Sequence, residues 1–558
     1  MIDLEIPLGK RTKLYRFFEM LPAIISYGLL LLLVVLSLVS PILAATYVLL
    51  VIVTMLVKAI GIALRTIQGR KRLELAQKVD WHTRLHDLEN PQFAYDQQRE
   101  ANSNDFGAFS HIENLRLVSA DSDSFPRPSQ IYNAVIIATY NESYDVLEPT
   151  VKSVASGTFD TKKIILVIAY EERGGDSIRN TVHKLKNKYG HIFHSFHLVQ
   201  HPKDMPDEVI GKGGNITYAG KYLKEWLKEV TIVSKDVIVT TLDADNRPHK
   251  TYFDYLTYEY IVNEDRKHLS YQPICLFFSN IWDAPAPMRV IATGNSFWNI
   301  ISSMRPHTLR NFASHSQPMD ALEEMNFWST RTIVEDGHQY WRSYFYFGGN
   351  YNVLPIYVPI YQDAVLTDTY LGTLKAQFVQ LRRWAYGASD VPYVATRIFS
   401  RQRNVSFFGG IARLLRLLDG HITLASVSIL VAIGGWVPLL LNSEASRSIP
   451  AHQLPDVVSG IQQIAMIGIF ITVFLSFKML PPRPERYKKS RTLFMLAQWV
   501  LMPFTAIGYS SFAALYSQGR LFLGKYLDKF DVTEKATHKS VALARKRSQK
   551  HRLMGDKS

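Results

Sequence analysis

Two carboxylates, one residue apart, stand where an apolar run ends in this chain of 558 residues. The run Val237 to Val239 predicts a buried strand of a parallel sheet, and Asp243 and Asp245 follow it. Residues two apart in an extended chain project from the same face, so both carboxylates can offer oxygens to one divalent cation and a phosphate-bearing substrate. Open α/β sheets bind ligands at the carboxyl ends of their strands. Taken alone, the pair is more typical of a solvated turn after a strand, and a cation site is the alternative that further motifs must support.

Two further segments combine polar groups with backbone amides. Thr139-Tyr140-Asn141-Glu142 follows an apolar run and can meet a nucleotide base or ribose, or it can simply cap the next helix. Gly211-Lys212-Gly213-Gly214-Asn215 offers amides and a cation to a phosphate, or forms a flexible turn before a helix. It is not a Walker A loop, because no Ser or Thr follows Lys212 and the upstream glycine is missing.

Two later segments carry charge beside aromatic residues. In Ile333-Val334-Glu335-Asp336-Gly337-His338 the acidic pair can act in catalysis or merely cap a helix. Glu335 and His338 have the spacing of a helical metal pair, but no second such pair exists to complete the site, so we disfavour this interpretation. Gln380-Leu381-Arg382-Arg383-Trp384 places two guanidinium groups beside an indole. They are suited to holding a diphosphate, or to anchoring an interfacial helix to lipid.

The sequence predicts that alternating strands and helices position these residues. Tyr132 to Ala138 and Ile164 to Ala169 predict strands, with a helical pattern between them, and the second strand leads into Tyr170-Glu171-Glu172-Arg173. A helix to about Val230 then precedes the strand that carries the aspartates. Alternation of this kind predicts a parallel sheet with right-handed crossovers.

Long apolar segments flank this region. Leu21 to Ser40 and Ile42 to Leu64, separated by Pro41, are each long enough to span a bilayer. We expect no signal cleavage, because the first run is too long and a second follows at once. Basic residues on both flanks predict a hairpin with its N-terminus in the cytoplasm. The roughly 300 residues that follow lack a convincing span, which predicts a cytoplasmic domain.

Membrane character returns near the C-terminus. An amphipathic segment, 407–418, predicts an interfacial helix, and 421–441 and 460–480 predict spans. Pro503 and Gly508 interrupt the last apolar segment, 493–516, for which we favour a re-entrant or interface-lying pair of half-helices that keeps the basic tail in the cytoplasm. The chain thus divides into a transmembrane hairpin, an amphipathic linker, a cytoplasmic domain, a C-terminal membrane region and a basic tail, at residues 1–64, 65–130, 131–400, 401–520 and 521–558.

The distribution of charge and the cysteine content indicate which classes of partner and compartment suit this protein. The net charge of +14 lies largely in the flanks of the spans and in the tail. Membrane lipids with anionic headgroups explain this placement better than nucleic acid, for which no binding module is visible. Cys275 is the single cysteine, so no disulfide framework is possible, as expected in a reducing compartment.

Taken in order, these motifs resemble the membrane-embedded family 2 glycosyltransferases, the group that includes cellulose synthases and hyaluronan synthases. The resemblance covers roughly residues 20 to 520, and the tail segment 530–535 also looks like its counterpart in that family. The matching residues are Thr139-Tyr140-Asn141-Glu142, Gly211-Lys212 through Asn215, Asp243-Ala244-Asp245, Glu335-Asp336 and Gln380-x-x-Arg383-Trp384.

The resemblance implies a GT-A fold, a nucleotide-sugar-binding α/β domain, in the plasma (inner) membrane with its catalytic domain in the cytoplasm. Asp245, with Asp243, would hold Mg²⁺ or Mn²⁺ against the diphosphate of a nucleotide sugar, most simply a uridine one. Asp336, beside Glu335, would be the general base of an inverting transfer. Arg383, with Arg382, would clamp the diphosphate, and Trp384 would give a sugar ring an apolar face. The Gln380-x-x-Arg383-Trp384 signature implies extension of a polysaccharide.

The chain departs from that family in two places. Where relatives carry an aspartate pair for the nucleotide, either Glu171 or Glu172 must substitute. The usual acceptor-side pattern is missing, and Ser314-His315-Ser316 stands in that region, with His315 expected to be structural. A single transfer to a lipid or a short glycan is therefore the runner-up. A membrane scaffold or transport subunit without turnover is a third possibility, although the proposed metal, base and clamp residues are all present.

Overall fold

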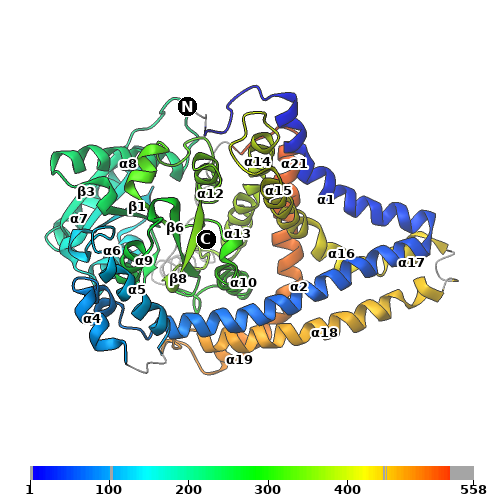
Figure 1. Ribbon diagram of the computed structural model, residues 1–558. Helices are drawn as coiled ribbons and strands as arrows, with labels where there is room; N and C mark the ends of the chain where they lie inside the picture. The colour runs from blue at the N-terminus through cyan, green and yellow to red at the C-terminus, as the bar shows by residue number, and fades with distance from the viewer. Residues whose placement is uncertain (1–3, 101–104, 444–446, 448, 528–558) are drawn as a thin grey trace, which may run out of the picture.

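The computed structural model describes residues 4–100, 105–443, 447 and 449–527 (Figure 1). Its centre is a mixed eight-stranded sheet in the order β3-β2-β1-β4-β7-β6-β8-β5. The predicted tail segment 530–535 lies outside the described residues. The strands are β1 (Tyr132–Thr139), β2 (Ile164–Glu171), β3 (Ser195–His201), β4 (Val237–Asp243), β5 (Arg247–Pro248), β6 (Leu269–Leu276), β7 (Ser316–Pro318) and β8 (Asn352–Tyr361).

The first half of the sheet is parallel, as the alternating pattern predicts. β1 pairs in parallel with β2 and with β4, and β2 pairs in parallel with β3. The second half is mixed, because β7 lies antiparallel between β4 and β6, while β8 runs parallel to β6 and antiparallel to β5. The carboxyl ends of β1, β2 and β4 therefore meet at one edge, where the candidate residues follow.

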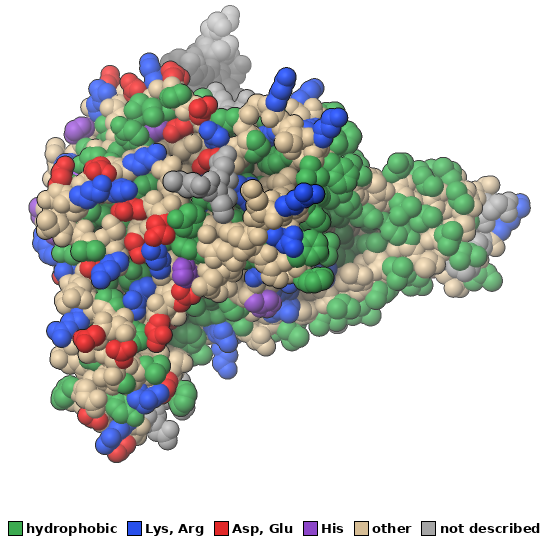
Figure 2. Space-filling model, turned by 45° about the horizontal axis from the view of Figure 1, so that its top comes forward, with side chains coloured by type: hydrophobic (Ala, Val, Ile, Leu, Met, Phe, Trp, Pro, Cys, Tyr) green, Lys and Arg blue, Asp and Glu red, His purple; other side chains and the backbone are tan. Residues whose placement is uncertain are grey.

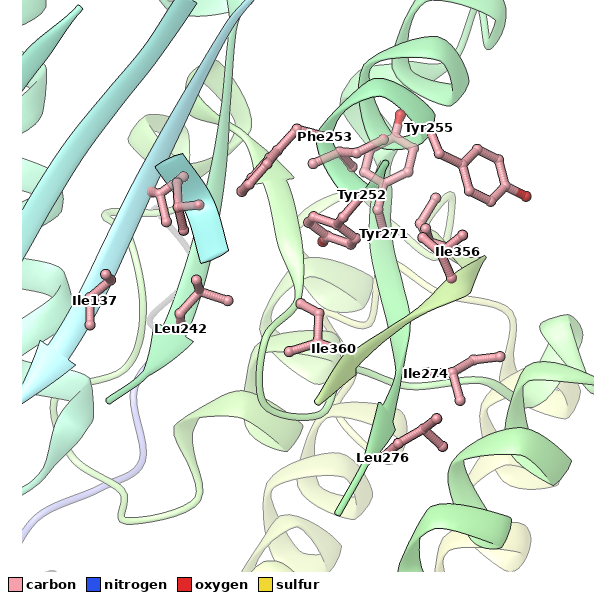
Figure 3. Close-up of a cluster of buried hydrophobic side chains, with 14 of the residues drawn as sticks. Ile137, Leu242, Tyr252, Phe253, Tyr255, Tyr271, Ile274, Leu276, Ile356 and Ile360 are labelled. Carbon is pink, nitrogen blue, oxygen red and sulfur yellow. The ribbon is translucent and has the colours of Figure 1, made fainter. Parts of the chain in front are cut away.

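Helices cover both faces of the sheet. The domain's longer helices are α6 (Tyr144–Ala155), α7 (Gly175–Tyr189), α8 (Lys212–Glu229), α9 (Tyr252–Val262), α10 (Ala286–Ser303), α12 (Glu335–Tyr346), α13 (Tyr370–Ala385) and α14 (Asp390–Ile398), with α11 (Met319–Glu324) shorter. Alternate residues of β1 separate the two layers: Ile136 packs with α8, whereas Ile137 packs with α6, α7 and α9. Figure 3 shows the second layer, where Tyr252 and Tyr271 lie between α9 and the strands.

The segment before the domain is helical and packs onto it. α3 (Trp81–Asp87) packs on α9, and α4 (Pro91–Gln98) packs on α5 (Ala108–Ala120), which contacts α9 at Tyr258. The Trp81 ring stacks on Tyr255 with 3.6 Å between ring centroids, and His111 accepts or donates a hydrogen bond at 2.9 Å to the Tyr258 hydroxyl. These residues join the same hydrophobic core as the sheet.

An apolar arm projects from the domain. α1 (Lys13–Val39) and α2 (Pro41–Ala76) meet at Ser40, and α18 (Ile449–Met479) lies along α2 (Figure 1). Figure 2 shows this arm covered mainly by hydrophobic side chains, whereas charged side chains of both signs cover the α/β domain. Among the described residues, four helices are long and apolar enough to cross a membrane: Lys13–Val39, Pro41–Ala76, Phe407–Ile433 and Ser490–Phe522.

The C-terminal helices differ in extent from the predicted segments. α15 (Phe407–Ile422), a π-helical turn and α16 (Ser428–Ile433) form one run, so the predicted interfacial helix continues into the predicted span. That span is interrupted before α17 (Val437–Leu441). The last run joins α19 (Ser490–Ala497), α20 (Met502–Thr505) and α21 (Phe512–Phe522), and bends between α19 and α21 (Figure 1). Pro503 is tolerated there because it lies in the first turn of α20.

Candidate active site

A cavity of about 1290 Å³ opens at the carboxyl ends of the strands. At one end it is lined by the ends of β1, β2 and β4 and by the first residues of α8 and α12. It continues past the loop after β8 and along α13, and reaches α2 and α15. The cavity thus joins the predicted catalytic residues to the apolar helices. The candidate residues that line it are Thr139, Tyr140, Glu142, Glu171, Lys212, Asn215, Asp243, Asp245, Glu335, Asp336, Gln380, Arg383 and Trp384.

Lys212 is the centre of the charged end. Its ammonium nitrogen lies 2.9 Å from a carboxylate oxygen of Asp243 and 3.1 Å from one of Asp336, and 3.9 Å from Glu335. The lysine begins α8, whereas the acidic pair begins α12. One cation therefore draws together carboxylates that lie about ninety residues apart in the chain.

Burial and mutual charge set the ionisation of this group. Burial opposes the charge on Lys212, but Asp243, Asp336 and Glu335 outweigh it and hold the pKa of the ammonium above its usual value. Burial, followed by the negative charge of Asp336, raises the pKa of Glu335, although Lys212 acts against this. One carboxylate oxygen of Glu335 is buried without a hydrogen-bond partner. The site holds more acidic groups than its single lysine balances.

The predicted metal ligands lie at this same end. The backbone N–H of Asp363 donates to Asp245 at 3.2 Å, and Asp245 is buried. The Asp243 side chain is 35% exposed and faces the cavity. Within the described residues, no three His, Cys, Asp or Glu side chains group closely enough to hold a metal. Two carboxylates nevertheless fit Mg²⁺ or Mn²⁺ at a diphosphate, because such ions take their remaining ligands from phosphate and water.

Two predicted binding residues also support the strand ends. Glu142 accepts hydrogen bonds from the Thr139 hydroxyl at 2.6 Å and from the Tyr140 N–H at 2.8 Å, so the carboxylate closes the turn after β1. Asn215 is buried and donates to the carbonyl of Ala169 at 2.9 Å, which ties α8 to β2. Thr139, Tyr140 and Glu142 all line the cavity as well.

The structure separates Glu171 from Glu172. Glu171 is buried at the end of β2, lines the cavity and pairs with Arg173 at 2.9 Å. Glu172 is exposed, and its carboxylate accepts the N–H of Lys203 at 3.0 Å, away from the lining residues. Successive side chains along an extended chain point in opposite directions, which accounts for the difference.

Sequence reasoning missed a histidine at this edge. His201, at the end of β3, lies 3.2 Å from Glu171 and 3.0 Å from Glu208. Burial disfavours charge on the imidazole, but the hydrogen bonds to both carboxylates outweigh it and raise the pKa of His201 to about 9. The signal available in the sequence was a polar residue at the end of a third strand.

The two arginines of α13 face different neighbours. Gln380, Arg383 and Trp384 line the cavity, and Trp384 is 38% exposed. The Arg382 guanidinium lies over the Tyr516 ring of α21, 5.5 Å from its centroid, and is not among the lining residues. Adjacent residues of a helix point about 100° apart, so the pair does not share one face.

Both neighbouring histidines are fully buried and hydrogen-bonded within the fold. His315 is fully buried, shares a hydrogen bond with the Phe312 carbonyl at 3.0 Å and accepts one from the Trp328 indole at 3.2 Å. Burial lowers the pKa of His315, which keeps it neutral beside Asp336. His338 pairs with Asp390 at 2.7 Å and is fully buried, so its helical spacing to Glu335 does not form a metal pair.

Comparisons with known proteins add little at this level of similarity. No protein-family model and no curated protein matches the chain. Among solved structures, the mannosyltransferase PcManGT from Pyrobaculum calidifontis, in complex with GDP-Man and Mn²⁺, is similar with a TM-score of 0.38 and 14% identity over 80% of this chain and 98% of its own. S. aureus TarS is similar with a TM-score of 0.32 and 11% identity, over 70% of this chain and 55% of its own. The TarS fragment 1–349 in complex with UDP has a TM-score of 0.32 and 10% identity, over 72% of this chain and 95% of its own. Similarity this distant carries no argument about activity, which must rest on the site.

Proposed function

We propose that the protein is a family 2 glycosyltransferase of the GT-A type that transfers a sugar from a nucleotide-sugar donor to an acceptor hydroxyl, with inversion at the anomeric carbon. The observation that carries the proposal is the convergence of Asp243, Asp245, Lys212 and Asp336 at one end of a cavity that Arg383 also lines. These residues provide a cation site, a general base and a phosphate clamp in one place.

The donor's diphosphate fits between the aspartates and the basic groups. Asp245 and Asp243 would hold Mg²⁺ or Mn²⁺, which offsets the charge that builds on the departing diphosphate. Arg383 presents a planar guanidinium suited to two phosphate oxygens. Uridine is our preferred base, and Tyr140 and Glu171 stand where the strands end to contact the nucleoside.

Asp336 would take the proton in the transfer step. The acceptor oxygen forms a bond to the anomeric carbon while the bond from that carbon to the diphosphate oxygen breaks. The acceptor's proton passes to the Asp336 carboxylate, and the nucleoside diphosphate leaves with the bonding electrons. The side chain of Asp336 is 19% exposed and lines the cavity, so an acceptor hydroxyl can reach it.

Lys212 would couple donor binding to this step. In the structure its ammonium hydrogen-bonds both oxygens of Asp336, at 3.1 and 3.2 Å, which occupies the oxygens that would receive the acceptor's proton. A diphosphate arriving beside Asp243 competes for the same ammonium. Donor binding would therefore free Asp336 to act as the base.

For the acceptor, we favour a growing polysaccharide at the cytoplasmic membrane face. The cavity runs from Asp336 past Trp384 to α2 and α15, which gives an extended product a path toward the apolar helices. The Trp384 indole lies 5.9 Å from the Phe277 ring, and the two rings form an aromatic surface suited to a sugar. Single transfer to a lipid or short glycan uses the same residues and is the alternative.

The test is a panel of nucleotide sugars with purified protein in detergent, Mn²⁺ and membrane extract as the acceptor source. We expect release of nucleoside diphosphate from one donor, and loss of that release in Asp245→Ala and Asp336→Asn. Glu172→Gln is the matched control, because its carboxylate lies outside the cavity.

A scaffold without turnover would release no nucleotide from any donor, and this result would contradict the proposal. Sizing the product on a gel then distinguishes the two acceptor classes. A ladder or high polymer supports polysaccharide extension, whereas one discrete addition supports single transfer.

A further inference from the structure

Three arginines from distant parts of the chain lie where α2 meets α10 and α15, and one of them lines the membrane end of the cavity. Arg65 lies on α2 where the predicted span ends, and Arg416 lies on α15. Arg305 follows α10 and lines the cavity itself. Neither the sequence motifs nor the proposed transfer step uses any of the three.

The packing of the three helices brings these positive charges near one another: α2 contacts Ile300 and Met304 at the end of α10 through Gly69, and its Lys58 reaches α15. Burial lowers the pKa of Arg305, and the charges of Arg65 and Arg416 lower it further. Within the described part of the chain, none of the three forms an ion pair with a carboxylate, and the Arg305 Nε is buried without a hydrogen-bond partner. Arg65 donates only to a carbonyl of its own helix, that of Gly61, at 3.2 Å.

The nearby carboxylate of Asp419 does not neutralise the three arginines. Asp419, on α15, pairs with Lys58 of α2 at 3.0 Å. Clustered guanidinium groups repel one another unless an anion lies among them. The arrangement therefore favours an anionic ligand, and several guanidinium donors suit the oxygens of a phosphate.

The surface around the cluster is apolar. Leu64 beside Arg65 is 56% exposed, and Leu415 beside Arg416 is 60% exposed. Trp298 lines the cavity near Arg305 and is 53% exposed. A ligand with a phosphate and a long apolar chain fits both features, because its phosphate meets the arginines while its chain lies against the apolar helices.

We propose that Arg65, Arg305 and Arg416 bind the phosphate of a membrane lipid, and that this lipid anchors the acceptor glycan, whether a growing polysaccharide or a short one, at the cavity. The arginine cluster alone supports the lipid-binding site, whereas the acceptor role rests on the proposed glycosyl transfer. The phosphate would remain at the membrane end while the lipid's sugar or headgroup hydroxyl extends along the cavity toward Asp336.

The binding test uses the full chain in detergent and dodecyl phosphate as the probe, followed by native mass spectrometry or tryptophan fluorescence. Arg305→Gln is expected to raise the dissociation constant at least about tenfold, and Arg65→Gln and Arg416→Gln by several-fold each. Arg401→Gln is the matched control, because this exposed arginine lies in the turn before α15 and outside the cluster.

Three results would overturn the binding proposal. Equal binding of inorganic phosphate would indicate a site for the free anion. Binding only to phosphatidylglycerol vesicles, weakened equally by Arg401→Gln, would indicate general attraction to an anionic surface. Absence of saturable binding of dodecyl phosphate to the wild-type protein would leave the cluster without a lipid ligand.

The acceptor role has a separate readout. In the donor assay, Arg305→Gln should lower transfer to membrane extract while leaving slow release to water unchanged. If no donor is turned over at all but dodecyl phosphate still binds through Arg305, the proposed function fails and the lipid site stands. If the donor is turned over and Arg305→Gln transfers as well as wild type, the acceptor role fails.

Discussion

The two ends of the cavity balance their charges differently. At the strand end, Lys212 lies among Asp243, Glu335 and Asp336, so acidic groups exceed the cation that holds them. At the membrane end, arginines gather without a carboxylate partner in the described chain. The first arrangement suits a ligand that brings a metal cation with its diphosphate, and the second suits a bare anion. The strand end lacks a cation and the membrane end lacks an anion, and a different substrate would supply each of these charges.

The largest expected effect concerns the base at the strand end. Asp336→Asn keeps the shape of the side chain but removes its ability to accept a proton, so turnover should fall by about 10²- to 10⁴-fold. Nucleotide affinity, measured by calorimetry, should change little. A fall in affinity equal to the fall in turnover would show that Asp336 binds the donor and is not the base.

Removing the central cation should cost stability. Lys212→Gln leaves Asp243 and Asp336 without the ammonium that pairs with both, which we expect to destabilise the domain by about 3 kcal/mol at neutral pH. Without Lys212, burial and Asp336 raise the pKa of Glu335 further, opposed only by Arg383 and a backbone hydrogen bond. A raised folded pKa means that stability is lost as pH rises, and the pKa of Glu335 is already about 8 with Lys212 present, so the deficit should grow as pH rises past about 8.

Thermal unfolding in detergent across this pH range checks the effect of Lys212. Lys221→Gln is the control, since Lys221 is exposed on the same helix. A deficit that is independent of pH, or equal in the control, would show that the strand end does not depend on charge compensation by Lys212.

His201 provides a smaller test of the same principle. Its folded pKa of about 9 lies above the ordinary value of 6.5, so the stability it contributes is complete below about pH 6.5 and is lost as pH rises through about 9. His201→Gln should lower stability by about 2 kcal/mol at pH 6 and by much less at pH 10. The exposed His183 of α7 is the control, and a pH-independent difference would contradict the charged pair.

The sequence predicts the parallel half of the sheet because β1, β2 and β4 are continuous apolar runs buried on both faces. It does not predict the mixed half. β7 has three residues and β5 has two, too few to show a period, and their directions are set by pairing with distant strands. The sequence predicts that the arm consists of long apolar helices. It does not predict that α15 and α16 join through a π-helical turn, because nothing in the composition marks such a turn.

For the site, residue types were predictable and their partners were not. The motifs single out Asp243 and Asp336, which line one cavity, yet the position of Lys212 between them depends on how α8 and α12 meet. Glu142 and Asn215 carry hydrogen bonds within the fold that a motif does not reveal. Among the arginines of the membrane end, Arg65 and Arg305 are separated by more than two hundred residues and Arg305 and Arg416 by more than one hundred, so only the tertiary structure brings them together.

The smallest expected effect separates neighbours in one motif. Arg383 lines the cavity, whereas Arg382 lies over the Tyr516 ring. Lysine keeps the charge but loses the fork that binds two phosphate oxygens, so Arg383→Lys should raise the KM for the donor about tenfold. Arg382→Lys should change that KM less than about twofold. Donor titrations of the two variants decide the matter. Equal effects would mean that both guanidinium groups reach the diphosphate, whereas a larger effect of Arg382→Lys would move the phosphate clamp to the side of α13 that faces α21.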